Sequence, residues 1–147
     1  MPEVVNSATL NAPADRVFDL VCHAERNVEW VPDLERSDRV TPGETRVGTR
    51  FRFVSRLAGI PVDVTDEVVQ LIPNRFIAFR GVTGPKHSGS WRFEPVGDGA
   101  QVRVTYRMQF ELPPAIGPIV ARVLKLEEKL DEQSRACLAN LRAMLER

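Results

Sequence analysis

Residues 118–147 read PIVARVLKLEEKLDEQSRACLANLRAMLER, and this stretch decides the fold. Asp131 precedes Arg135 by four residues, the favourable order for a helical ion pair, and Pro118 suits a first helical turn. A helix over this stretch would be about 45 Å long and must bury its apolar face against a broad partner. Its apolar residues recur mostly at steps of three and four, with one longer gap at Ser134: Ile119, Val123, Leu126, Leu130, Cys137, Leu141 and Met144.

The chain before this helix reads mostly as β-strands separated by turn-forming residues. Short connections between consecutive strands are typical of an antiparallel meander. The expected order is one strand, two short helices, six strands and the long helix. The alternation and the turn signals predict strands over 3–11, 34–40, 47–56, 61–72, 75–82, 88–96 and 100–111.

Two short helices are predicted between the first and second strands. Residues 11–15 open the first, with Pro13 near its first turn and Asp15 favourable to the helix dipole. A break is expected over 23–27. A second short apolar turn follows around Trp30 and is stopped by Pro32.

Two tight turns suggest how the later strands pair. If Pro73 and Asn74 form a two-residue loop, Glu67 faces Arg80 across the hairpin. If Gly97 and Asp98 form another, residue 91 faces 104 and residue 89 faces 106. The apolar residues of this second hairpin should form the inner face of the sheet: Trp91, Phe93, Val102, Val104, Tyr106, Met108 and Phe110.

Composition favours one domain over residues 1–147 and excludes several classes of protein. The 147 residues carry 20 basic and 20 acidic side chains and no basic run, so nucleic acid is not an expected partner. We expect a cytoplasmic monomer or homodimer without an integral membrane segment, since no apolar run is long enough to span a bilayer and no basic-then-apolar leader is present. Cys22 and Cys137 are expected to be buried free thiols.

No metal, cofactor or catalytic motif is visible in the sequence. His23 and His87 lack partners at ligand spacing, so we expect neither a metal ion nor a cofactor. The simplest interpretation of His87 is a loop or strand-start residue, although it could line the mouth of a cavity. No serine lies in a nucleophile elbow, and no glycine-rich phosphate loop leads into a helix.

Two long segments resemble the polyketide cyclase/dehydrase and lipid-transport family of the START-like (SRPBCC, Bet v 1-like) superfamily. They are residues 7–40, SATLNAPADRVFDLVCHAERNVEWVPDLERSDRV, and 89–113, GSWRFEPVGDGAQVRVTYRMQFELP. The resemblance implies an α+β helix-grip fold, in which a curved antiparallel seven-stranded sheet wraps the long C-terminal helix around an apolar cavity. Members of the family bind lipids, polyketides, quinones or plant-hormone-like molecules, and some are aromatase/cyclases.

The candidate cavity residues include one charged pair. By the hairpin register, Glu67 and Arg80 share a side with Val69; if that side lines the cavity, the pair lies on its wall. The alternative is a surface ion pair, with the other face inward. Asp63 and Asp66 are expected on the opposite, solvated face.

Aromatic residues and the long helix supply the other candidates. Tyr106 is the best candidate for a polar ligand contact, because a buried hydroxyl needs a partner. Ser134, small and polar within the apolar stripe, is expected to leave room for a ligand. The full set of candidate cavity residues is Trp30, Glu67, Val69, Arg80, Trp91, Val104, Tyr106, Leu126, Leu130 and Ser134.

Three functions remain open from the sequence. The first is binding or transport of a small hydrophobic molecule, lipid, polyketide or quinone-like, in an internal cavity. The second is a polyketide cyclase/dehydratase-type enzyme. The resemblance implies an arginine in the cavity of such enzymes, but Val69 and Leu71 occupy the corresponding part of the fourth strand, and Arg80 would have to replace that charge. The third is a protein-interaction module.

Overall fold

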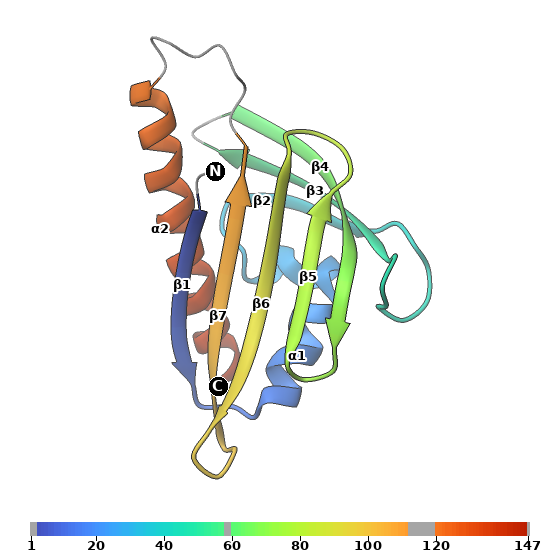
Figure 1. Cartoon of the computed structure of the whole chain (residues 1–147), viewed down its shortest axis with the longest axis vertical. Helices are drawn as coiled ribbons and strands as arrows, with labels where there is room; N and C mark the ends of the chain where they lie inside the picture. The colour runs from blue at the N-terminus through green and yellow to red at the C-terminus, as the bar shows by residue number, and fades with distance from the viewer. Residues whose placement is uncertain (1–2, 58–59, 112–119, 147) are drawn as a thin grey trace.

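The computed structural model describes residues 3–57, 60–111 and 120–146, which form one curled antiparallel sheet and three helices (Figure 1). The sheet order is β1-β7-β6-β5-β4-β3-β2, so that β1 and β2 are its edges. The strands are β1 (Glu3–Leu10), β2 (Leu34–Arg39), β3 (Arg50–Leu57), β4 (Ile60–Ile72), β5 (Phe76–Gly81), β6 (His87–Val96) and β7 (Gln101–Phe110).

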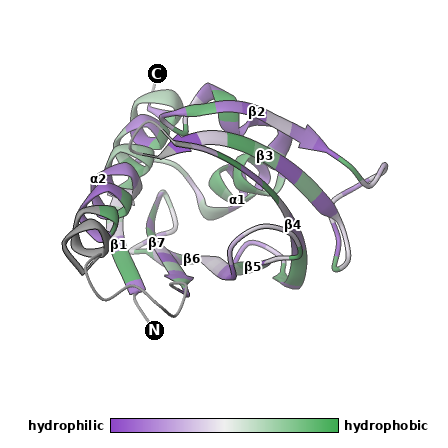
Figure 2. Cartoon of the chain, turned by 90° about the horizontal axis from the view of Figure 1, so that it is seen from above, coloured by the Kyte–Doolittle hydropathy of each residue, from purple (hydrophilic) through white to green (hydrophobic). Residues whose placement is uncertain are grey.

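The long helix α2 (Val120–Leu145) lies alongside β1, at the open side of the curled sheet (Figure 2). The predicted fold class is therefore confirmed: a curved seven-stranded sheet with a long C-terminal helix. The expected helix start at Pro118 lies outside the described residues.

Two short helices connect β1 to β2, as predicted, but the second begins earlier than expected. They are α1 (Ala14–Cys22) and the 3₁₀ helix η1 (Ala24–Glu29). The expected break over 23–27 is confined to His23, whose ψ of 67° ends α1, and η1 begins at the next residue, with the backbone N–H of Arg26 donating to the carbonyl of His23 at 2.9 Å. As a result, Trp30 is the residue that ends η1.

The β6–β7 hairpin has the predicted inner face in a different register. Its loop is four residues long rather than two, with Val96 opposite Gln101, so Trp91 faces Tyr106. Gly97 and Gly99 have φ of 60° and 91°, a conformation that favours glycine and produces the longer loop. The pairing shifts by two residues, which leaves every side chain on its predicted face.

The β4–β5 hairpin differs from its predicted register in two places that cancel. Its loop has three residues, with Ile72 opposite Phe76 and a turn bond from Arg75 N–H to Ile72 O at 3.0 Å. A β-bulge between Val68 and Gln70 then adds one residue on β4. Glu67 therefore faces Arg80 as predicted, because the extra residue in the loop and the extra residue in the bulge offset each other.

The core lies between the inner face of the sheet and the helices. Phe93 of β6 is fully buried and meets Phe18 of α1 edge to face, with ring centroids 5.5 Å apart. Leu138 and Leu141 of α2 belong to the same cluster. Burial of these apolar surfaces is the main contribution to folding and holds the sheet in its curl.

Candidate functional site

A cavity of about 160 Å³ lies within the curl of the sheet. Strands β3 to β7 contribute to its wall, together with the segment from η1 to β2 and helix α2. Most of its wall is apolar or aromatic: Trp30, Val31, Phe53, Phe79, Trp91 and Met108 are among the residues that line it.

Three aromatic side chains make the central part of this wall. Trp91 stacks on Tyr106, with ring centroids 4.2 Å apart and an angle of 15° between the ring planes. Trp30 meets Trp91 edge to face at 5.6 Å. These rings pack against one another across three elements, so they present fixed flat surfaces to a ligand.

Asp66 and His87 form a hydrogen-bonded pair on the wall of the same cavity. His87 Nε2 is 2.6 Å from Asp66 Oδ1, and both side chains are more than four-fifths buried. Strand β5 lies between their two strands, and Gly81, opposite Asp66, is what lets them meet. A Cβ at Gly81 would overlap the His87 imidazole, so the missing side chain leaves a passage for the ring across β5.

The hydrogen bonds of His87 determine where its protons lie. Its Nδ1 is 2.6 Å from the carbonyl oxygen of Pro85, which can only accept, so Nδ1 carries a hydrogen. The hydrogen bond to Asp66 raises the pKa of His87, against the lowering effect of burial. Since a carboxylate can only accept, the 2.6 Å contact places one proton between Nε2 and Asp66 Oδ1, and with a hydrogen already on Nδ1 neither ring nitrogen is free to accept a further proton.

The other titratable groups on the cavity wall are neutral. Burial, followed by the neighbouring Cys137 and Asp66, raises the pKa of Tyr106 well above its ordinary value of 10.0. Burial raises the pKa of the Cys137 thiol to about 12. The Tyr106 hydroxyl makes only a long contact of 3.8 Å to the sulfur of Met108, which leaves it able to donate to a ligand.

Two buried polar atoms, each closed to solvent, belong to residues that line the cavity and have no partner among the residues that the structure describes. They are the indole Nε1 of Trp30, a donor, and the amide Oδ1 of Asn27, an acceptor. Both residues line the cavity, and both atoms are buried. Buried polar atoms are normally hydrogen-bonded, so this pair is the least satisfied part of the wall.

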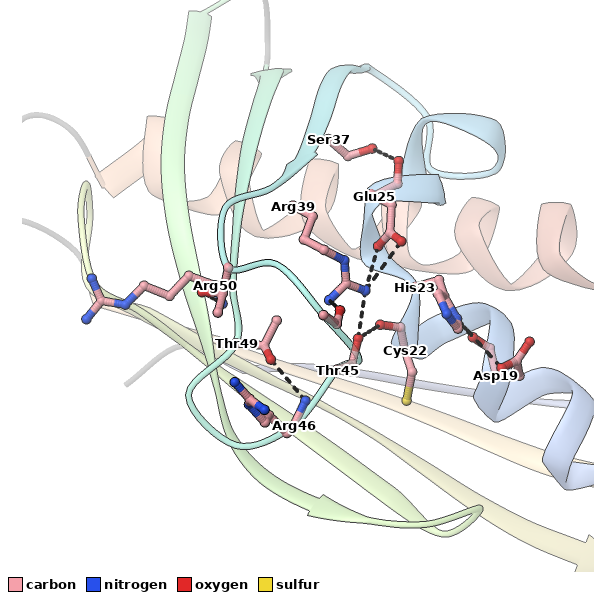
Figure 3. A network of polar contacts seen from close by, with 12 residues as sticks. Asp19, Cys22, His23, Glu25, Ser37, Arg39, Thr45, Arg46, Thr49 and Arg50 are labelled. Atoms are coloured by element: carbon pink, nitrogen blue, oxygen red, sulfur yellow. Dashed lines mark hydrogen bonds and ion pairs between the residues drawn. The ribbon is translucent and has the colours of Figure 1, made fainter.

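A polar network holds η1 against the sheet (Figure 3). Ser37 Oγ of β2 donates to the backbone carbonyl of Glu25 at 2.8 Å. Arg39 donates to the Glu25 carboxylate at 3.1 Å and to Thr45 Oγ1 at 2.9 Å, and Thr45 in turn donates to the carbonyl of Cys22 at 2.7 Å. The network makes η1, and therefore the Asn27 side of the cavity, a rigid part of the fold.

Three predicted site residues, Trp30, Trp91 and Tyr106, line the cavity. Val104 is fully buried in the main core and does not reach it. Leu126 and Leu130 instead pack in a separate small cluster against β1 and β7. These last three residues support the fold rather than the ligand site.

The prediction that Ser134 leaves room for a ligand is wrong. Its side chain is 1% exposed, and its Oγ accepts a hydrogen bond from Asn6 Nδ2 of β1 at 3.1 Å. The same amide donates to Asp131 at 2.9 Å. The gap in the apolar stripe of α2 is therefore filled by a polar contact with the edge strand.

The prediction that Glu67, Val69 and Arg80 line the cavity is also wrong. Arg80 is 64% exposed and lies 3.6 Å from Glu67, which also accepts from Arg50 at 3.1 Å. Val69 lies on the bulge and is 39% exposed. The inward positions on this part of the sheet belong to Asp66, Val68 and Phe79, so the charged pair is on the outer face.

Asp66 is the main cavity residue that the sequence does not predict, because the expectation of a solvated face for it is wrong. A signal for it was present: Val62, Val64, Asp66 and Val68 alternate along β4, which puts the carboxylate in an otherwise apolar row. Asn27 also lines the cavity, and no pattern in the sequence indicates it. For His87, the cavity interpretation is the one that the structure supports.

A larger hollow of about 600 Å³ lies outside the cavity, beside α1. Charged side chains border much of it, among them Asp15, Arg16, Asp19 and Glu44, with Phe18 as an aromatic neighbour, whereas several aromatic rings line the smaller cavity. The described residues contain no group of three or more histidine, cysteine or acidic side chains able to hold a metal ion. The smaller cavity is therefore the better candidate site.

The curled sheet and the long C-terminal helix define a helix-grip fold, and the sequence matches one family model. The family model for polyketide cyclase / dehydrase and lipid transport matches residues 1–146, and the chain belongs to this family. No helix among the described residues has the length and apolar character to cross a bilayer.

Several solved structures share the fold. The Zhui aromatase/cyclase of Streptomyces sp. R1128 is 22% identical with a TM-score of 0.83, covering 99% of this chain and 94% of that one. A Thermus thermophilus protein, TTHA0849, is 22% identical with a TM-score of 0.81, covering 98% and 97%. The di-domain ARO/CYC protein BexL, from the BE-7585A biosynthetic pathway, is 27% identical with a TM-score of 0.74, covering 99% of this chain and 47% of that one.

A curated relative is the uncharacterized protein Rv0088 of Mycobacterium tuberculosis, which is 28% identical over 114 residues. The match covers 77% of this chain and 50% of that protein, so the chain spans about half the length of the curated relative.

Proposed function

We propose that this protein binds a small hydrophobic molecule of about one substituted ring in the cavity described above. The observation that carries the proposal is an aromatic-walled cavity of about 160 Å³ between the sheet and α2. A dry apolar cavity of about 150 Å³ accommodates benzene, whereas pockets for drug-sized ligands measure about 300–1,000 Å³. A longer lipid or polyketide would place one ring-sized end inside.

Toluene is a suitable probe, because the chain offers a direct reporter. Its two tryptophans, Trp30 and Trp91, both line the cavity. Toluene should therefore shift both indole N–H resonances in a saturable titration. A titration that leaves both resonances in place would overturn the proposal.

A matched pair of variants locates the ligand. Gly89 faces the cavity beside the Tyr106 ring, and Ser90 follows it on the other face of β6. Gly89→Val adds volume to the cavity and should weaken toluene binding about tenfold or more, while Ser90→Val should leave it unchanged. Equal effects of the two changes would place the ligand elsewhere.

A second candidate function, catalysis on a carbonyl compound, is favoured by one specific observation. Asp66 is a buried carboxylate on the cavity wall, and its Oδ2 has no partner among the described residues. It could remove an α-proton from a bound ketone and return it, while the Tyr106 hydroxyl donates to the enolate oxygen. His87 could not be the base, since both of its nitrogens are engaged.

Deuterium exchange at the methyl group of acetophenone tests this second function. Exchange faster than in buffer, lost in Asp66→Asn while toluene still binds, would support catalysis. Exchange at the buffer rate in the wild-type protein would leave binding as the function.

A further inference from the structure

The inward side of β4 places one unpaired carboxylate oxygen at the cavity. Asp66 shares this side with Val64 and Val68, so its side chain points into the curl of the sheet. Its Oδ1 is held by His87 Nε2 at 2.6 Å, while Oδ2 has no partner among the described residues. The side chain keeps 16% exposure, and Oδ2 is not closed off as the indole nitrogen of Trp30 is. A free acceptor is therefore in contact with the cavity.

The pair formed by Asp66 and His87 carries no net charge. One proton lies between Nε2 and Oδ1, and Nδ1 carries a hydrogen toward Pro85 O at 2.6 Å. Whichever atom holds the shared proton, the charges of the pair cancel and Oδ2 remains an acceptor. Both ring nitrogens of His87 are engaged, so the ring offers no donor to a bound molecule.

The rest of the wall supplies no compensating cation. No lysine or arginine is among the described residues that line the cavity. Its neutral donors include the Tyr106 hydroxyl, which makes only a long contact of 3.8 Å to the sulfur of Met108. A neutral hydroxyl does not offset the lost hydration of a full negative charge. A carboxylate would be buried beside Asp66 without a counter-ion, whereas an O–H or N–H group would find an acceptor.

We propose that Asp66 determines which polar group the cavity accepts: the ligand is a neutral one-ring molecule whose O–H or N–H donates to Oδ2, and carboxylates are rejected. The proposal rests on the proposed function, because it names the class of molecule that the hydrophobic cavity selects. Ring alcohols and ring amides fall within this class. Fatty acids and aromatic acids fall outside it.

Three one-ring probes separate this selectivity from simple burial of apolar surface: toluene, benzyl alcohol and benzoate. Toluene is more hydrophobic than benzyl alcohol, so a cavity without a free acceptor would favour toluene. With Oδ2 as the acceptor, benzyl alcohol should bind the wild-type protein at least as tightly as toluene, measured by calorimetry at neutral pH. It should also bind more than about tenfold more tightly than benzoate.

The wild-type comparison can overturn the proposal by itself. Tighter binding of toluene than of benzyl alcohol would do so, and so would benzoate binding within about tenfold of benzyl alcohol. Either result would leave the proposed function standing. Failure of the wild-type protein to bind both toluene and benzyl alcohol would overturn the proposed function itself, and this proposal with it.

A matched pair of variants on β4 assigns the selectivity to Asp66. Asp66→Asn removes the ionisable group at nearly the same size and supplies an amide N–H, so the affinity for benzoate relative to benzyl alcohol should rise about tenfold or more. Glu67→Gln removes the neighbouring carboxylate, which pairs with the exposed Arg80, and should leave that ratio unchanged. Toluene binding shows that the cavity of each variant is intact. A ratio that stays unchanged in Asp66→Asn, or that changes equally in both variants, would overturn the assignment.

Discussion

At the scale of single residues, Asp66 and His87 determine how the protein responds to pH. The folded state raises the pKa of His87 above its ordinary value of 6.5, so the folded protein binds that proton more tightly than the unfolded chain. The stabilisation is complete below about pH 6.5 and is lost as the pH rises through the folded pKa. The free energy of unfolding should therefore decrease across this range, measured by urea unfolding at a series of pH values.

Two variants test the cause of this dependence. Asp66→Asn removes the charge partner, and it should cost about 1.5–3 kcal/mol at low pH and flatten the curve. Gly81→Ala should have the same effect on the pH dependence, because its Cβ would displace the His87 ring. His23→Gln is the control for the other histidine. If Asp66→Asn keeps the full pH dependence, another group causes it.

The pair Glu67 and Arg80 represents the opposite situation, a charge pair on the outer face. Since Arg80 is 64% exposed, solvent screens the attraction, and the coupling energy of the pair should lie below about 1 kcal/mol. A double-mutant cycle with Glu67→Gln and Arg80→Met, followed by thermal unfolding, measures this energy. A coupling energy of several kcal/mol would contradict the exposed placement and show that the pair is buried.

At the scale of elements, the β4–β5 hairpin depends on one strained position. Asn74 has φ of 61° in its three-residue loop and is exposed, so only its backbone conformation matters. Asn74→Gly should be nearly neutral, whereas Asn74→Val should cost about 1–2 kcal/mol, because a β-branched residue is disfavoured in this conformation. Urea unfolding of the two variants gives the comparison. Equal stability of the variants would show that the loop adopts another conformation in solution.

The helix α2 acts on the site through its polar residues as well as its apolar face. Asn140 and Gln133 donate hydrogen bonds to the backbone carbonyls of Trp30 and Pro32. Ser134 accepts a hydrogen bond from Asn6 of β1. The helix thereby connects the edge of the sheet to the segment that presents the indole of Trp30 to the cavity. This connection explains why Ser134 lies in the apolar stripe without lining the cavity.

At the scale of the whole molecule, one cluster of buried side chains joins α1, α2 and the inner faces of the sheet. We expect the chain to unfold as a single domain in one cooperative transition. Near-ultraviolet circular dichroism, which follows the buried tryptophans, and the far-ultraviolet signal should give the same midpoint in urea. Separate midpoints would show that the helix and the sheet are independent units.

The amino-acid sequence by itself determined the order of the elements and the inner face of the β6–β7 hairpin. The alternation from Val102 to Phe110 and the three-and-four spacing in α2 are local patterns, and each depends only on which side of its own element a residue lies. The inner face of β6 and β7 could therefore be predicted even though the register was two residues off. The same reasoning found Trp30, Trp91 and Tyr106, because large aromatic residues near an inner face tend to be buried.

Only the tertiary structure decided which polar groups enter the cavity. The bulge at Val69 and the three-residue turn before Phe76 change the register of β4 in opposite senses, and neither is encoded by alternation. Asp66 and His87 come from strands that are not neighbours, and they meet because Gly81 leaves space between them. Asn27 and Trp30 lack partners only once η1 is packed against α2 and β2. Burial and long-range pairing depend on the whole folded chain. They arise from contacts between distant segments, which the local sequence does not specify.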